Sequence, residues 1–293
     1  MKKLIFIHGR DQHGKDPKEL KNLWIKSFKE GLEKSGLTIN ISEDDILMPF
    51  YGDKLDYLVN NLDSILDNIV NRGNEDNLLD TKEMRFSQEF LSEIAQNANI
   101  SESELQEQYN LDLRDRGILN WPWILSILRA IDKRGNWGEL SIKKFTYDVF
   151  LYLTNNNIKR IINDIVLQKI PNDPCIVVGH SLGSIVGYNI LRDNPKLKII
   201  KYITIGSPLG VNAIKNKLST PIKMPECINE GYWYNAFDPH DTVSLNSLDE
   251  NNFNISPLIK NYGKVDNYTE NQHGIEGYLS DSFVAKEIYN ALS

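Results

Sequence analysis

Cysteine is scarce in this sequence, and its scarcity limits the chemistry that the chain can support. Only 2 cysteines occur among 293 residues, and Cys175 and Cys227 lie far apart, without the close spacing of a zinc site. A chain with so few cysteines does not depend on disulfides, which is typical of a reducing compartment. We therefore expect no metal site and no functional thiol.

Long apolar runs are also absent. No segment approaches the roughly 18 apolar residues that identify a membrane-spanning helix, so we expect no integral membrane segment. The chain opens with Lys2 and Lys3, but the apolar run from Leu4 to Ile7 ends at His8. A secretory signal peptide needs an apolar stretch of about 7–15 residues and a small-residue cleavage site. The sequence therefore predicts a mature cytoplasmic protein.

Positive charge is in deficit. The chain has 33 Lys and Arg against 40 Asp and Glu, a formal net charge of −7. This balance gives no long-range attraction for the phosphates of nucleic acid or for anionic membranes, so nucleic acid is not an expected partner. Hydrophobic residues make up 41% of the chain, enough for a substantial core, and we expect a single domain over residues 1–293.

Short β-rich runs alternate with helical stretches along the chain. Strands are expected in five places: Lys3–Ile7, Ile46–Tyr51, the run that begins at Cys175, Ile199–Ile205 and Tyr232–Phe237. Helices are expected from an N-cap at Asp16 to about Gly36, over 145–170 and over 279–292, with 242–277 rich in loops. Strands separated by helices imply a parallel sheet with right-handed crossovers. The fold class is therefore α/β, with a mostly parallel twisted sheet and helices on both faces.

Residues 50–145 are expected to form a helical insertion within this domain. Apolar residues recur at helical spacing over about 53–71, a second helix is expected over about 81–96, and Ser101 with Glu104 forms a capping box for a third. The sequence ILNWPWILSILRAI follows from Ile118. Its Trp121 and Trp123 are candidates for a substrate-pocket wall or a lid, and the alternative is that they pack the insertion onto the main domain.

A serine motif interrupts the apolar run that begins at Cys175. Residues 179–183 read Gly-His-Ser-Leu-Gly, and a small-residue stretch compatible with a helix follows. A serine at the tip of a tight turn between strand and helix adopts strained backbone angles, and its neighbours two positions away lie too close to other backbone for side chains. Gly179 and Gly183 meet that need. The motif resembles the nucleophile elbow of α/β-hydrolases, which implies that Ser181 is a nucleophile.

A serine nucleophile needs a base, and the base needs an acid to orient it. The resemblance implies the chain order Ser, Asp or Glu, His, and only His240 and His273 follow Ser181. His240 shares a short loop with both candidate acids, so its ring is poorly placed to hydrogen-bond with the carboxylate of either. His273, in a loop just before the last expected helix, is the preferred base.

Two aspartates follow the strand expected over 232–237. Asp241-Thr242-Val243 resembles the Asp-x-Val step of lipase-like esterases, so Asp241 is the preferred acid. Asp238 is the alternative acid, although an aspartate before Pro239 also commonly starts a turn.

The segment after the first strand completes the resemblance. Ile7-His8-Gly9-Arg10 resembles the oxyanion segment of lipases and esterases, which implies that the backbone N–H groups of Leu182 and Arg10 stabilise an oxyanion, with Gly9 allowing close approach. The alternative is that this His-Gly pair forms only a turn.

The resemblance to the lipase-like α/β-hydrolases covers roughly residues 1–50 and 145–293. The chain departs from this family in two places. It begins with the strand before the oxyanion segment, so we expect a reduced hydrolase fold, and the helical insertion at 50–145, which we expect to act as a lid or cap, matches no lid of the family. The resemblance also implies a serine hydrolase without a cofactor that cleaves carboxylic esters of small molecules or lipids through an acyl-enzyme on Ser181.

Two other functions stay open. The same fold can serve as a non-enzymatic protein-interaction module, with the insertion binding a partner. Gly9 to Lys15 also fits the spacing of a P-loop nucleotide site, but Asp16 stands where a serine or threonine would hold magnesium. The sequence gives no indication of the oligomeric state.

Overall fold

The computed structural model describes residues 2–61, 75–109, 121–135, 138–228 and 232–293, and its sheet is entirely parallel over that part of the chain. The strands are Lys3–Ile7 (β1), Ile46–Leu47 (β2), Cys175–His180 (β3), Ile199–Ile205 (β4), Trp233–Ala236 (β5) and Lys260–Tyr262 (β6). They form one 6-stranded sheet in the order β2-β1-β3-β4-β5-β6, and every neighbouring pair is parallel. The expected α/β class with a parallel sheet is confirmed.

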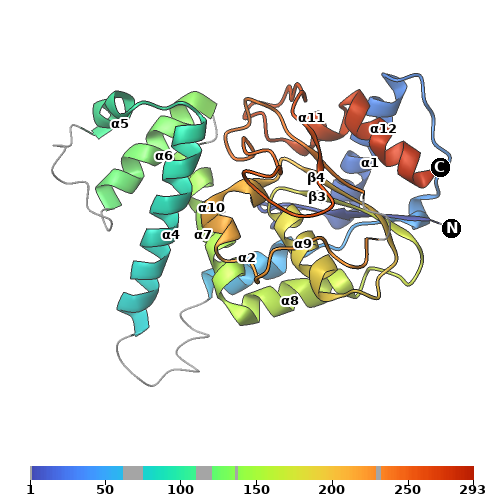
Figure 1. Ribbon diagram of the computed structural model, residues 1–293, viewed down its shortest axis with the longest axis horizontal. Coiled ribbons are helices and arrows are strands. Elements are labelled where there is room, and N and C mark those ends of the chain that lie inside the picture. Colours follow the sequence, from blue (N-terminus) through green and yellow to red (C-terminus); the bar gives the residue numbers. More distant parts are fainter. Residues whose placement is uncertain (1, 62–74, 110–120, 136–137, 229–231) are drawn as a thin grey trace.

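Helices make up most of the remaining regular structure (Figure 1). Those before the serine motif are Pro17–Glu33 (α1), Gly52–Asn60 (α2), Glu75–Asn97 (α4), Glu102–Tyr109 (α5), Trp121–Gly135 (α6), Glu139–Thr154 (α7) and Asn156–Leu167 (α8). Those after it are Leu182–Asp193 (α9), Asn212–Lys215 (α10), Ile275–Leu279 (α11) and Ser282–Leu292 (α12). None of the helices in the described ranges combines the length and apolar character needed to span a bilayer.

The two faces of the sheet bury separate hydrophobic cores. Successive side chains of a strand point to opposite faces, so Ile5 and Ile7 of β1 join the core that contains α8 and α9, whereas Leu4 and Phe6 join the core beneath α1 and α12. These helix pairs lie on opposite sides of the sheet (Figure 1). Right-handed crossovers explain this, because β1 connects to β2 in one direction along the sheet and β3 connects to β4 in the other.

The strand order reverses between β1 and β3. Open parallel sheets bind ligands at the carboxyl ends of the strands, in the crevice where the strand order reverses. The residues that follow β1 and β3 are those of the expected oxyanion segment and the serine motif. The topology therefore brings these two motifs to the same edge of the sheet.

All the elements described between β2 and β3 are helical. Helix α4 packs against α6, α7 and α10, and α5 packs against α6. In Figure 1, α4, α5 and α6 form a group beside the sheet, on the side away from α1 and α12. Buried residues of α4 and α7, among them Phe86, Phe90 and Phe145, share one continuous core with the α8 and α9 face of the sheet.

Several expected elements differ from those observed. The expected helix over 145–170 is two helices, because the extended backbone of Asn155 ends α7 while its side chain accepts hydrogen bonds from Asn157 and Ile158 N–H and so caps α8. The strand expected to reach Tyr51 ends at Leu47, since the Tyr51 N–H donates to the ring of His8 instead of to a neighbouring strand.

Other boundaries also changed. The helix expected over 53–71 ends at Asn60 in α2, and residues 62–74 lie outside the described residues. The last helix begins at Ser282 rather than 279, because Asp281 caps it through the N–H groups of Phe283 and Val284. The region expected to be rich in loops contains β6, whose sequence Lys-Asn-Tyr has no apolar alternation that would identify a strand.

Candidate active site

Ser181 occupies the turn between β3 and α9 with a backbone conformation that side chains rarely adopt. Its φ is 55° and its ψ is −127°, and it is 3% exposed. A Cβ atom on Gly179 would lie 2.8 Å from the Gly183 carbonyl oxygen, and one on Gly183 would collide with the carbonyl oxygens of Ile7 and His8. Strained backbone of this kind persists only where the surroundings enforce it, and here the two glycines allow the surroundings to approach. The strand, tight turn and helix expected around Ser181 are confirmed.

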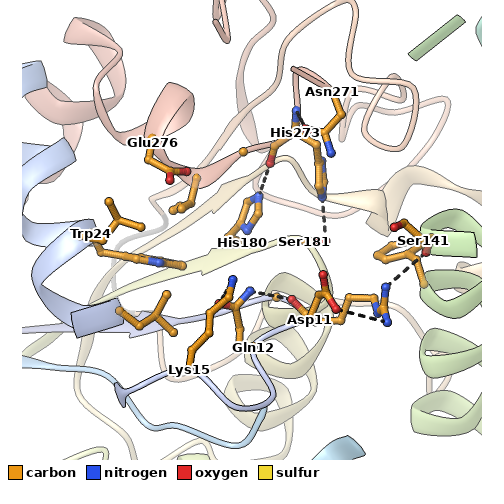
Figure 2. Close-up of a pocket in the computed structure, with 17 residues that line it drawn as sticks. Asp11, Gln12, Lys15, Trp24, Ser141, His180, Ser181, Asn271, His273 and Glu276 are labelled. Carbon is orange, nitrogen blue, oxygen red and sulfur yellow. Dashed lines mark hydrogen bonds and ion pairs between the residues drawn. The ribbon is translucent and has the colours of Figure 1, made fainter. Parts of the chain in front are cut away.

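Three residues distant in sequence are joined by hydrogen bonds at this turn. The Nε2 atom of His273 lies 2.9 Å from Ser181 Oγ, and its Nδ1 lies 2.6 Å from Asp241 Oδ2. His273 comes from the loop before α11, and Asp241 from the loop after β5. Figure 2 shows the His273 ring directed toward Ser181. Since all three side chains are buried, the hydrogen bonds are protected from competition with water.

The Asp241 carboxylate is held by several donors. It accepts hydrogen bonds from the Tyr278 hydroxyl at 2.6 Å, the Ser244 hydroxyl at 2.7 Å and the Val243 N–H at 3.1 Å. Burial by itself would raise the pKa of Asp241, but the adjacent His273 ring and the hydrogen bonds from His273, Tyr278 and Ser244 outweigh it and lower that pKa below its usual value. Asp241 is therefore ionised at neutral pH.

Asp238, the alternative acid, has different partners. One of its oxygens accepts from the His240 N–H at 2.6 Å and lies 3.0 Å from His240 Nδ1, and the other accepts from the Asn267 N–H at 2.6 Å. These contacts tie the loop after β5 to the segment that leads to His273. Asp241 contacts the His273 ring, and Asp238 stabilises the surrounding loops.

His180 and Gly206 support His273, and neither stood out from the sequence as part of the site. The Nε2 atom of His180 lies 2.9 Å from the His273 carbonyl oxygen. Burial and then the nearby His273 lower the pKa of His180 to about 3, so its ring is neutral and Nε2–H donates to that carbonyl. A Cβ on Gly206, whose φ is 55°, would lie 3.2 Å from His273 Cε1. The only sequence signal was the position of His180 within the serine motif.

Gly9 and Leu182, two of the residues expected to form the oxyanion site, lie next to Ser181. A Cβ on Gly9 would lie 2.9 Å from Ser181 Cβ, so the segment after β1 is in contact with the serine. Leu182 is the first residue of α9, where an N–H group has no carbonyl one turn earlier to bond. The Arg10 side chain is anchored away from the serine, because its Nε donates to Asp148 Oδ2 at 2.7 Å and its Nη1 donates to the Ser141 carbonyl at 3.3 Å.

A cavity of about 280 Å³ opens beside Ser181 and His273. In Figure 2, Trp24 and Glu276 lie on one side of it and Ser141 on the opposite side. Its lining combines an apolar group from α1 and α11 with polar residues of the segment after β1: Leu20, Leu23, Trp24, Ile275, Arg10, Asp11, Gln12 and Lys15. Helix α7 contributes Ser141 and Phe145.

Trp123, one of the two tryptophans expected as candidates for a pocket wall, is not among these lining residues. Trp123 packs against the core shared by the helical segment and the sheet, which corresponds to the packing alternative. The side chain of Trp121 lies outside the described residues.

The P-loop alternative has no support from the start of α1. The Asp16 carboxylate accepts hydrogen bonds from the N–H groups of Lys18 and Glu19, so an anionic side chain occupies the helix end where a phosphate would bind. Across the described ranges, no three or more His, Cys, Asp or Glu residues are grouped so as to hold a metal ion.

Comparison with known proteins assigns no family to the chain. No protein-family model matches it, and no curated protein matches it significantly in sequence. Function is therefore inferred from the geometry of the site.

Proposed function

We propose that this protein is a serine hydrolase of the α/β-hydrolase type that cleaves carboxylic esters without a cofactor. The observation that carries the proposal is the hydrogen-bonded series from Ser181 Oγ through His273 to Asp241, at a strained turn beside a cavity. A serine hydroxyl becomes a nucleophile when an oriented imidazole can take its proton, and the buried carboxylate supplies that orientation.

In the proposed mechanism, Ser181 Oγ attacks the ester carbonyl carbon while His273 Nε2 accepts the serine proton. The tetrahedral intermediate collapses, the bond to the leaving oxygen breaks, and His273 gives its proton to the departing alcohol. Water then attacks the acyl-enzyme with His273 again as base, which releases the acid and restores Ser181. The ionised Asp241 stabilises the imidazolium that forms in each half of the reaction.

The oxyanion is proposed to bind to the backbone N–H groups of Leu182 and Arg10. The contact between Gly9 and Ser181, and the position of Leu182 at the start of α9, support this pairing. Donors that already point at the developing charge need no reorganisation during the reaction, and removing one typically costs about 10²–10³ in kcat.

The cavity supports a compact substrate. The cavity volume of about 280 Å³ lies at the small end of the roughly 300–1,000 Å³ that is typical of small-molecule pockets. Its apolar wall on α1 suits a short acyl group, and its polar wall after β1 suits hydroxyl or carbonyl groups. The part of α7 that lines the cavity supports a role for the helical insertion as a cap.

Labelling by a fluorophosphonate probe, together with hydrolysis of p-nitrophenyl butyrate, tests the proposal. We expect rapid labelling and turnover in the natural protein, and loss of both in Ser181→Ala with an unchanged melting temperature. Ser35→Ala, just beyond the end of α1, serves as the control and should behave like the natural protein. Unchanged turnover in Ser181→Ala would refute the mechanism, and a folded natural protein that neither labels nor turns over ester would favour the interaction module.

A further inference from the structure

His8 is fully buried directly after β1, yet it takes no part in the series from Ser181 to Asp241. Its Nδ1 lies 2.6 Å from the Gly9 carbonyl oxygen, and its Nε2 lies 3.1 Å from the backbone nitrogen of Tyr51. A backbone N–H can only donate, so Nε2 accepts and the proton resides on Nδ1, which donates to Gly9. The hydrogen bonds therefore select one tautomer of the neutral ring.

The surroundings hold the His8 ring in this state. It stacks on the Tyr51 ring with centroids 4.0 Å apart and an angle of 21° between the planes, and the Tyr51 hydroxyl donates to the His8 carbonyl. Burial, with a smaller contribution from nearby Lys15, lowers the pKa of His8 to about 4, and the hydrogen bond to Gly9 opposes this shift in part. His8 is thus neutral at physiological pH and has a single orientation.

The hydrogen bond to Gly9 also fixes the next N–H group along the chain. In a trans peptide, the carbonyl of one residue and the N–H of the following residue point in opposite directions. The cis peptides in the described part of the chain are at Pro221 and Pro257, so the Gly9–Arg10 peptide is trans. Because His8 holds the Gly9 carbonyl, the Arg10 N–H points away from the His8 ring.

The far side of Arg10 is anchored as well. Its guanidinium donates to Asp148 and to the Ser141 carbonyl of α7, and its own carbonyl accepts from Gln12 Nε2 at 2.7 Å. With Gly9 in contact with Ser181, the peptide between Gly9 and Arg10 is held at both ends beside the nucleophile.

We propose that His8 is a positioning residue whose Nδ1–H orients the Gly9–Arg10 peptide, so that the Arg10 N–H is directed at the oxyanion formed on Ser181. This inference rests on the proposed function, because an oxyanion forms only if Ser181 attacks a carbonyl. It assigns His8 a role in stabilising the transition state without contact with substrate.

Two variants isolate the donor. His8→Asn keeps a short side chain whose amide N–H can reach the Gly9 carbonyl, whereas His8→Phe keeps a stacking ring but has no donor. Both leave the Tyr51 N–H without its ring acceptor, so the difference between them reports the bond to Gly9. We expect His8→Phe to lower kcat about 10- to 100-fold with little change in KM, a smaller effect than the complete loss of an oxyanion donor. His8→Asn should retain most of the kcat of the natural protein.

A second readout separates this role from general structural support. Phenylboronic acid adds to the serine as a tetrahedral anion, so its affinity should fall in His8→Phe in parallel with kcat. His13→Phe, at an exposed histidine paired with Asp53, is the control and should change neither quantity. Equal kcat values for the Asn and Phe variants, at matched melting temperatures, would overturn the proposal.

Nitrogen-15 NMR of the natural protein gives a test that is independent of activity. We expect the His8 ring to remain neutral with its proton on Nδ1 between pH 5 and 8. A proton on Nε2 would overturn the inference even if the protein is an esterase. A natural protein without esterase activity but with the expected tautomer would instead refute the proposed function.

Discussion

The hydroxyl of Tyr278 donates to the same oxygen of Asp241 that faces His273 Nδ1, and both distances are 2.6 Å. Tyr278 also accepts a hydrogen bond from the backbone N–H of Asp238 at 3.2 Å. The buried Tyr278 hydroxyl on α11 therefore links the Asp241 carboxylate to Asp238, in the loop that carries both aspartates. Tyr278 therefore supports the site, although it is part of no motif that the sequence analysis identified.

Tyr278→Phe should weaken this support by removing one donor to Asp241. A hydrogen bond to a charged group contributes about 1.5–3 kcal/mol, so we expect a loss of that order in unfolding free energy at pH 7. The lowered pKa of Asp241 contributes stability that is present above its unfolded pKa, about 3.9, and is lost as pH falls through its folded value. The difference in stability between the variant and the natural protein should therefore narrow in acid, to the part that comes from the lost acceptor of the Asp238 N–H.

Urea unfolding at pH 7 and near pH 3 measures this difference. Tyr262→Phe, which loses only a longer hydrogen bond from an exposed hydroxyl to the Lys264 carbonyl, should show little change and provides the control. A stability loss in Tyr278→Phe that is the same at both pH values would mean that the hydroxyl has no special interaction with the ionised carboxylate.

Asp241→Asn and Asp238→Asn should differ in their effect on ester hydrolysis. Asp241 contacts the His273 ring, and its replacement by an amide favours the wrong imidazole tautomer, so kcat should fall by several orders of magnitude. Asp238 accepts mainly backbone N–H groups, which an asparagine oxygen can still satisfy, so its variant should lose less than about tenfold. Steady-state kinetics on p-nitrophenyl butyrate measures both, and the reverse ranking would assign the acid to Asp238.

Short acyl chains should be preferred substrates. The cavity of about 280 Å³ is small for a ligand pocket, so an acetyl or butyryl chain should fit its apolar wall better than a dodecanoyl chain does. We expect kcat/KM for p-nitrophenyl esters to be highest at two to four acyl carbons. Leu23→Ala on α1 should shift the optimum toward longer chains, because the smaller side chain enlarges the cavity at its apolar wall. A series of chain lengths, measured below the micelle concentration, tests this, and a maximum at long chains would contradict it.

Stability should fall as pH falls below about 6.5, the ordinary pKa of histidine. Burial lowers the pKa of His8 to about 4 and that of His180 to about 3, so both stay neutral in the folded protein while the unfolded chain takes up protons. Each histidine therefore lowers the free energy of unfolding by about 1.4 kcal/mol per pH unit between its unfolded and folded pKa. Urea unfolding at pH 7, 6 and 5 should reveal this slope, and His180→Gln should reduce it.

Much of the fold could be predicted from local sequence patterns. The alternation of β-rich and helical stretches predicted an α/β fold with a parallel sheet, and the glycines around Ser181 predicted the tight turn between strand and helix. Both depend on residues within a few positions of one another, whose periodicity and steric limits hold in any tertiary context. The boundary at Asn155 and the short strand Lys260–Tyr262 lacked such a signal, because a single cap and an edge pairing decide them.

For the site, the sequence by itself determined the turn that presents Ser181 and the two loops that carry candidate partners. Only the tertiary structure decided that His273, 92 positions from Ser181, contacts that serine, and that Asp241 rather than Asp238 contacts the His273 ring. The supporting roles of His8, His180 and Tyr278 could not be predicted for the same reason. Their roles depend on which loops the packed sheet and helices bring together, and distances between loops are set by the whole fold rather than by any local stretch of chain.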